Sequence, residues 1–141
     1  MPDERLPVSE KNFVFTEWLA HRAEEVTERF LTSGRERPTA IVCGSDDLAC
    51  VAIRTARRLG FAVPEDLSVV GFSDSHQCNF SDPPLTSVAQ PFEAIGQRCG
   101  ALLIEQIQTG KIPKGRRNPE KLATSLVVRA STAKPGSDRR A

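Results

Sequence analysis

Hydrophobic residues recur along the chain with two alternating spacings, one typical of helices and the other of strands. Three stretches repeat apolar residues every three or four positions, which predicts one apolar helix face in each: 19–30, 46–59 and 91–107. Each stretch is followed by a glycine, a common helix stop signal: Gly34, Gly60 and Gly110. Short runs rich in β-branched residues predict strands between the helices: a run starting at Thr39, then 67–72, 86–89 and 124–129.

The alternation of predicted strands and helices indicates an α/β protein. Right-handed crossovers between such strands produce a mostly parallel sheet with helices on both faces. A length of 141 residues, 39% of them apolar, is sufficient for one core of ordinary domain size. We therefore expect one domain at 1–132, followed by a disordered tail at 133–141.

Charge and cysteine content exclude several classes of protein. A net charge of +1 provides no basic field for nucleic acid, so this chain by itself is not expected to bind DNA. The four cysteines form no C-x-x-C pair and the two histidines complete no zinc spacing, so neither a metal nor another cofactor is predicted. Because the first residues include acidic side chains and no long apolar run, we expect a cytoplasmic protein without a membrane segment.

Small and acidic residues follow the first two predicted strands. Ser45 and Asp46 come after the first run, and Ser73 and Asp74 come after the second, at the start of a polar loop over 73–84. Open α/β sheets bind ligands at the carboxyl ends of their strands, so these residues are candidates for a ligand site. Ser or Asp before a helix is also an ordinary N-cap, and the second pair also fits a simple turn. Both interpretations stay open.

Four segments resemble the lactose-repressor/galactose-repressor (LacI/GalR) family of transcription regulators: 38–49, 69–74, 83–92 and 126–132. The most specific of these reads PPLTSVAQPF, from Pro83 to Phe92. The resemblance covers roughly residues 16–132. It implies the carboxyl-terminal portion of an effector-binding domain with a type I periplasmic-binding-protein-like fold. The family's helix-turn-helix headpiece is not recognisable in this sequence.

The resemblance also implies which residues line the effector cleft. The family has Asn at the position of Ser45 and Asp at the position of Ser73, so both side chains are shorter here and the second lacks the charge. Trp18 matches an aromatic residue that stacks on the effector, with Phe15 as a rival. Phe92 forms either a cleft wall or part of the core. The full set of implied ligand-binding residues is Trp18, Ser45, Asp46, Ser73, Asp74, Gln90 and Phe92.

Six successive apolar residues at 48–53 indicate that the second predicted helix is buried on more than one side. The resemblance implies that this helix contributes to a homodimer interface, through Leu48, Ala49, Cys50 and Ile53. A second layer of structure within the same chain is the alternative.

The predicted function is the ligand-sensing and dimerisation part of a LacI/GalR-type DNA-binding repressor, without enzymatic activity. A small, sugar-like effector would bind between subdomains, and operator DNA would be bound only through a headpiece missing from this chain. One alternative is a fragment of a periplasmic-type solute-binding protein. The other is a Mg²⁺-dependent phosphoacceptor or enzyme that uses Asp46, Asp47 and Asp74.

Overall fold

The computed structural model of the chain describes residues 10–34, 37–110 and 120–134. Its helices are α1 (Ala20–Thr32), α2 (Asp46–Arg58) and α3 (Phe92–Thr109), with two short 3-10 turns, η1 (Glu10–Asn12) and η2 (His76–Asn79). Its strands are β1 (Ala40–Val42), β2 (Ser68–Ser73), β3 (Thr86–Ala89) and β4 (Ser125–Val127). The α-helices and strands begin within one residue of the predicted ones, whereas η2 forms inside the predicted loop.

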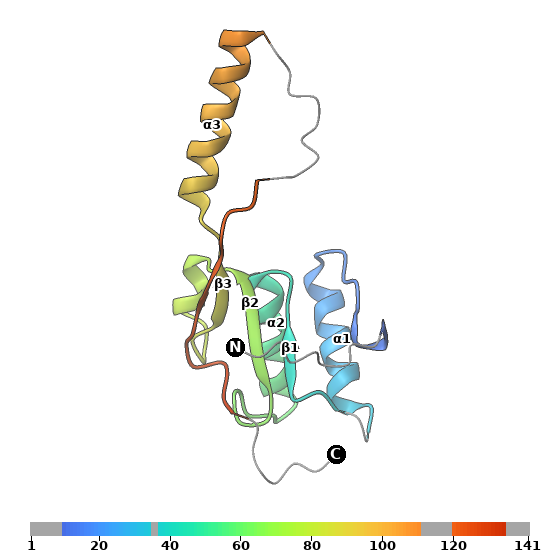
Figure 1. Cartoon of the computed structure of the whole chain (residues 1–141). Helices are drawn as coiled ribbons and strands as arrows, with labels where there is room; N and C mark the ends of the chain where they lie inside the picture. The colour runs from blue at the N-terminus through green and yellow to red at the C-terminus, as the bar shows by residue number, and fades with distance from the viewer. Residues whose placement is uncertain (1–9, 35–36, 111–119, 135–141) are drawn as a thin grey trace.

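The described strands form one sheet in the order β1-β2-β3-β4. β1, β2 and β3 run parallel, and β4 returns antiparallel to β3. This arrangement confirms the predicted α/β class with a mostly parallel sheet. Because the three parallel strands share a direction, their carboxyl ends lie along one edge of the sheet, here called the carboxyl edge (Figure 1).

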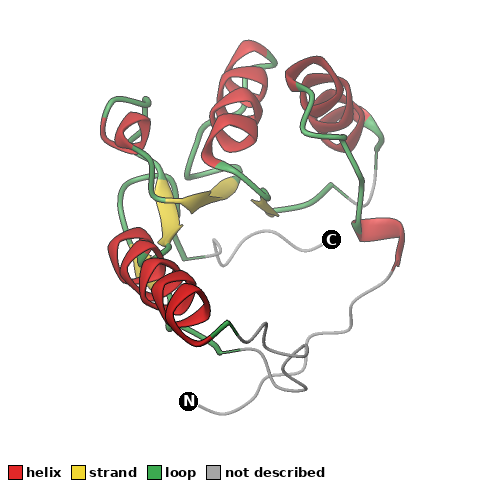
Figure 2. Cartoon of the chain, turned by 90° about the horizontal axis from the view of Figure 1, so that it is seen from above, coloured by secondary structure: helices red, strands yellow, loops and turns green. Residues whose placement is uncertain are grey.

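The main core lies between α2 and one face of the sheet. Leu67, Val69 and Leu85, on or next to the strands, are fully buried, and Ala49 and Ile53 of α2 pack in the same cluster. A second helix, α1, packs against α2 on the same side of the sheet (Figure 2). α2 is therefore enclosed by two neighbours of the same chain.

The position of α2 corrects the predicted dimer interface. Ala49 and Ile53 face the core, while Leu48 packs with Ala23 of α1. All three predicted interface residues are buried, so they are not available to a partner. The apolar run is explained by a second layer within the chain, because α1 covers the side of α2 that the sheet does not. Only Cys50, the fourth residue of that prediction, is partly exposed.

The opposite face of the sheet has no helix packed on it among the described residues. Register places Val42 beside Val70, and Phe72 beside Val88 and then Leu126, so these side chains share one apolar face. Val42 and Leu126 are exposed on it. α3 does not cover this face, because it projects beyond the carboxyl edge (Figure 1). The expectation of helices on both faces is thus met on one face only within the described chain.

The closing segment is attached to the sheet beyond the predicted domain boundary. The Ala133 backbone N–H donates to Ser68 Oγ at 3.2 Å, so the first residue of the predicted tail contacts β2. Residues 135–141, the remainder of that tail apart from Lys134, lie outside the described residues. Among the helices that the structure describes, none has the length and apolar character needed to cross a membrane.

Candidate functional site

The carboxyl edge brings together side chains that are far apart in the sequence. Ser45 caps the start of α2, where its Oγ accepts a hydrogen bond from the Leu48 N–H at 3.3 Å. At the end of β2, Ser73 Oγ accepts a hydrogen bond from Gln90 Nε2, which follows β3, at 3.2 Å. Sequence reasoning left two roles open for Ser45, and the capping role is present in the structure. Its hydroxyl lies at the same edge as the Ser73–Gln90 pair.

Trp18 lies against the backbone at the end of β1. A side chain at Gly44 would place its Cβ 3.3 Å from Trp18 Cη2, so the indole ring rests on Gly44, next to Ser45. Glu17 and Trp18 both have positive φ, 52° and 61°, in the turn that leads into α1. The ring is nevertheless 66% exposed. An exposed aromatic face beside polar groups is suited to stacking on a small molecule.

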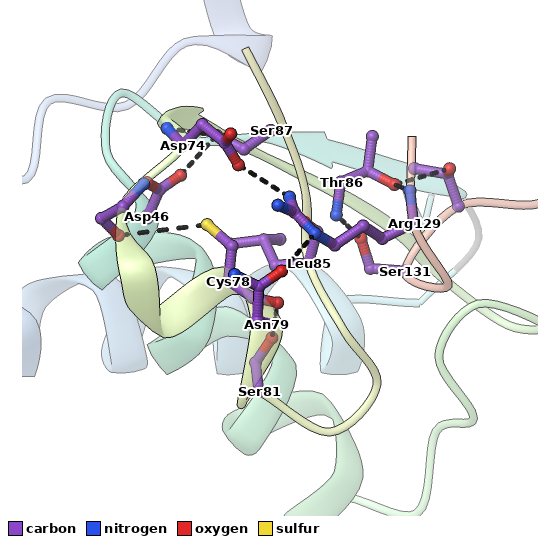
Figure 3. Close-up of polar contacts among 12 residues, drawn as sticks. Asp46, Asp74, Cys78, Asn79, Ser81, Leu85, Thr86, Ser87, Arg129 and Ser131 are labelled. Carbon is purple, nitrogen blue, oxygen red and sulfur yellow. Dashed lines mark hydrogen bonds and ion pairs between the residues drawn. The ribbon is translucent and has the colours of Figure 1, made fainter. Parts of the chain in front are cut away.

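Asp46 faces the interior rather than solvent. Its residue is only 2% exposed, and Ser87 Oγ donates to its Oδ1 at 2.6 Å while the Ser75 N–H donates to its Oδ2 at 2.7 Å. The Cys78 thiol also donates to this carboxylate (Figure 3). The carboxylate that was predicted to contact a ligand is thus occupied by the protein's own donors, and it holds β3 and the loop after β2 onto α2.

The ionisation of this buried cluster follows from its hydrogen bonds. Burial acts to raise the pKa of Asp46, but the bonds from Ser87 and Ser75 outweigh it, so the pKa lies below the usual range for Asp. Burial, together with the neighbouring Asp46 carboxylate, raises the pKa of Cys78 to about 11. At neutral pH Asp46 is therefore a carboxylate and Cys78 a thiol, which is the combination that their hydrogen bond requires.

The other two predicted acids are also engaged. Asp74 Oδ1 accepts a hydrogen bond from Arg129 Nη1 at 2.8 Å, in an ion pair whose side chains are 23% and 16% exposed. Asp47 Oδ1 accepts from Gln77 Nε2 at 2.7 Å. Within the residues that the structure describes, no three His, Cys, Asp or Glu side chains are grouped to hold a metal ion. The arrangement gives no support to the magnesium alternative.

Phe92, Ser87 and Arg129 were placed less well by sequence reasoning. Phe92 begins α3 and is exposed, so within the described chain it is not part of the core. Ser87 and Arg129 were not proposed as site residues at all. A signal existed for both, because each lies inside a segment that carries the family resemblance, in PPLTSVAQ and in LVVRAST.

Residues 2–132 match the family described as periplasmic binding protein-like domain. The chain belongs to this family. The periplasmic binding protein-like match spans nearly the whole sequence and includes every residue of the carboxyl edge described above.

Curated relatives and solved structures with this periplasmic binding protein-like domain are transcription regulators. The HTH-type transcriptional regulator MalR of Streptomyces coelicolor is 46% identical over 101 residues, which are 72% of this chain and 28% of MalR. The lac repressor dimer bound to operator and the anti-inducer ONPF matches with a TM-score of 0.71 and 33% identity, over 83% of this chain and 39% of that one. The transcriptional regulator CelR in complex with cellobiose matches with a TM-score of 0.73 and 29% identity, over 88% and 37%.

These matches confirm the resemblance to LacI/GalR regulators inferred from the sequence. The chain is part of an effector-binding domain, and it spans well under half the length of the relatives that it matches. The relatives are regulators rather than enzymes, in agreement with the prediction made from the residues.

Proposed function

We propose that the chain binds a small, neutral, sugar-like effector at the carboxyl edge and does so as part of a transcriptional regulator. The observation that carries the proposal is the Ser73–Gln90 hydrogen bond at the same edge as Ser45 and the exposed ring of Trp18. The cellobiose complex of the related regulator CelR supports a sugar as the ligand class.

The chemistry of the edge favours a neutral ligand. Hydroxyls donate and accept hydrogen bonds, and an amide adds an oxygen acceptor, so Ser45, Ser73 and Gln90 together match the hydroxyls of a sugar. The nearby carboxylates of Asp46 and Asp74 are engaged with donors of the protein, so neither contributes a free negative charge. The apolar face of a sugar ring would stack on Trp18.

The role of the whole protein follows by extension. Operator DNA would be bound by a headpiece outside this chain, and the effector would shift the population of conformations that bind DNA. Such a regulator would reside in the cytoplasm. A solute-binding protein has the same fold, but the relatives reported above favour the regulator.

The ligand proposal is tested by the fluorescence of Trp18, the only tryptophan in the chain. Cellobiose and other neutral mono- and disaccharides are titrated up to about 10 mM, a range in which weak complexes still form. Binding of one of them should change the emission. Gln90→Ala should then weaken the affinity about tenfold, the value of one lost hydrogen bond of roughly 1.4 kcal/mol.

The matched control is Gln97→Ala, which removes an amide from the exposed surface of α3, where Gln97 bonds to Glu93. This variant should titrate as the unmodified chain does. If no neutral sugar alters the emission, or if Gln90→Ala and the unmodified chain titrate alike, the proposed ligand site is wrong.

We also propose that the chain forms a homodimer through a groove between α2 and η2. The groove has a volume of about 400 Å³, and its lining includes Cys50, Arg54 and Phe80. The Phe80 ring is 73% exposed, and a large exposed ring beside arginines is typical of interface hot spots. The lac repressor to which the chain is similar is described as a dimer.

Phe80→Glu should convert the dimer to a monomer, because it places an unpaired charge in the interface. Sedimentation velocity over a range of concentrations measures this change. Phe13→Glu is the control, since Phe13 is similarly exposed, at 71%, and does not line the groove. If both variants sediment as the unmodified chain does, the groove is not the interface.

A further inference from the structure

The turn that presents Ser73 has an unusual backbone. Ser73 and Asp74 have φ of 114° and 54°, both in the left-handed region that favours glycine, and neither is glycine. Such conformations persist only where the surrounding structure imposes them, and they gather at functional sites. The direction of the Ser73 hydroxyl therefore depends on whatever holds this turn.

Three contacts hold the turn. The Asp74 N–H donates to Ser87 Oγ at 3.1 Å, and the Ser75 N–H donates to Asp46 Oδ2 at 2.7 Å. The third contact is the ion pair between Asp74 Oδ1 and Arg129 Nη1. It is the contact that engages the side chain of a turn residue from the far end of the sequence, because the two residues are 55 positions apart.

Arg129 is itself fixed from several directions. Its Nε donates to Asn79 Oδ1 at 3.0 Å and its Nη1 to the Leu85 carbonyl at 2.9 Å. Its backbone N–H donates to Thr86 Oγ1 at 2.9 Å (Figure 3). A planar guanidinium held by several acceptors has little freedom left, so it places Asp74 rather than following it.

We propose that Arg129 is a positioning residue for effector binding. Its guanidinium holds the Asp74 carboxylate and thereby keeps the Ser73 hydroxyl at the carboxyl edge, in contact with Gln90. This assignment rests on the proposed function of the edge, although Arg129 itself need not touch the ligand. It makes affinity depend on a residue two positions beyond β4, the strand that returns to pair with β3.

A purely structural role for Arg129 makes a different prediction. In that case the residue only fastens the closing segment to the sheet, where the Val69 N–H donates to the Ser131 carbonyl and the Ala130 N–H to the Pro84 carbonyl. Loss of Arg129 would then release these two amides and leave the turn unchanged. The two roles are separated by which amides lose protection.

The experiment is residue-resolved amide hydrogen exchange on the full chain, which needs no ligand. The decisive variant is Asp74→Asn, because Asn also tolerates a left-handed φ and leaves the bonds of Arg129 to Asn79 and Leu85 in place. The amides of residues 74 and 75 should exchange at least tenfold faster than in the unmodified chain. The amides of Val69 and Ala130 should change less than twofold. Arg129→Met should accelerate the two turn amides at least as much.

Asn79→Ala is the matched control, since it removes one contact of Arg129 without touching the turn, and its turn amides should exchange within twofold of the unmodified chain. The proposal is overturned if Asp74→Asn leaves both turn amides within twofold of their original rates, or if Arg129→Met releases only Val69 and Ala130. Should a neutral sugar bind, Asp74→Asn should also weaken its affinity about tenfold. Failure to bind any sugar would contradict the proposed ligand but not the exchange result.

Discussion

Replacement of Asp46 by alanine is expected to lower the free energy of unfolding by about 3 kcal/mol. The change leaves the Ser87 hydroxyl and the Ser75 N–H without the acceptor that each has in the folded chain. Each buried polar group left without a partner costs roughly 1–3 kcal/mol, and bonds to a charged group are at the upper end. Urea unfolding followed by circular dichroism measures the loss.

Asp47→Ala is the matched control, because Asp47 is the next residue in the same helix turn and its bond to Gln77 is exposed. Its expected cost is below about 1 kcal/mol, the usual range for an exposed interaction. Equal costs for the two variants would mean that the buried cluster around Asp46 does not hold the edge together.

The same bonds predict how Asp46 contributes to stability as the pH changes. Its pKa in the folded chain is held below the value in the unfolded chain, where an Asp has a pKa of about 4. The folded state therefore favours the carboxylate, and this stabilisation is present above the unfolded pKa and is lost as the pH falls through the folded pKa. The difference in unfolding free energy between the unmodified chain and Asp46→Asn should shrink as the pH is lowered from 7 to about 3. A constant difference would contradict this account.

Gly71→Ala is expected to destabilise the chain by about 2–3 kcal/mol. A Cβ at this position would overlap Asp46 Oδ1 and would stand 2.9 Å from Leu85 Cδ2. Asp46 cannot move aside without breaking its bonds to Ser87 and Ser75, and the Leu85 side chain is fully buried. Overpacking of this kind typically costs 1–3 kcal/mol. The midpoint and slope of urea unfolding provide the measurement.

The control for this prediction is Gly96→Ala, in α3, where an added Cβ meets nothing within 4 Å. Alanine is a better helix former than glycine, so this variant should leave stability unchanged or raise it by up to about 1 kcal/mol. If Gly71→Ala unfolds at the same urea concentration as the unmodified chain, the close approach of Asp46 to β2 is wrong. The role of Gly71 in the Gly-Phe-Ser-Asp turn would then need another explanation.

Gly71 shows why a motif and its physical cause are different kinds of knowledge. The sequence places Gly71 directly before the residues of the carboxyl edge, which marks the segment as a turn that follows a strand. The turn itself is built by Ser73 and Asp74, whose φ values are positive. Gly71 lies within β2, opposite Ser87, and its missing side chain makes room for Asp46. Only the packing of α2 on the sheet reveals that requirement.

The prediction of the dimer interface failed for a related reason. The run at 48–53 correctly indicated burial on two sides, because apolar residues all around a helix require cover all around it. The pattern contains no information on which element provides the cover. α1 provides it, through contacts such as that of Ala23 with Leu48, and this left the groove beside Phe80 as the surface proposed for a partner.

The sequence alone determined the order of helices and strands, the mostly parallel sheet and the edge at which polar side chains gather. These features depend on local periodicity and on the fixed hand of the crossovers, both of which can be read from neighbouring residues. The tertiary structure alone decided that Asp46 faces the interior and that Asp74 is paired with Arg129. Those outcomes depend on contacts between residues 41 and 55 positions apart, and a pairing at such separations is settled by how the helices and strands pack together, not by the residues next to each partner.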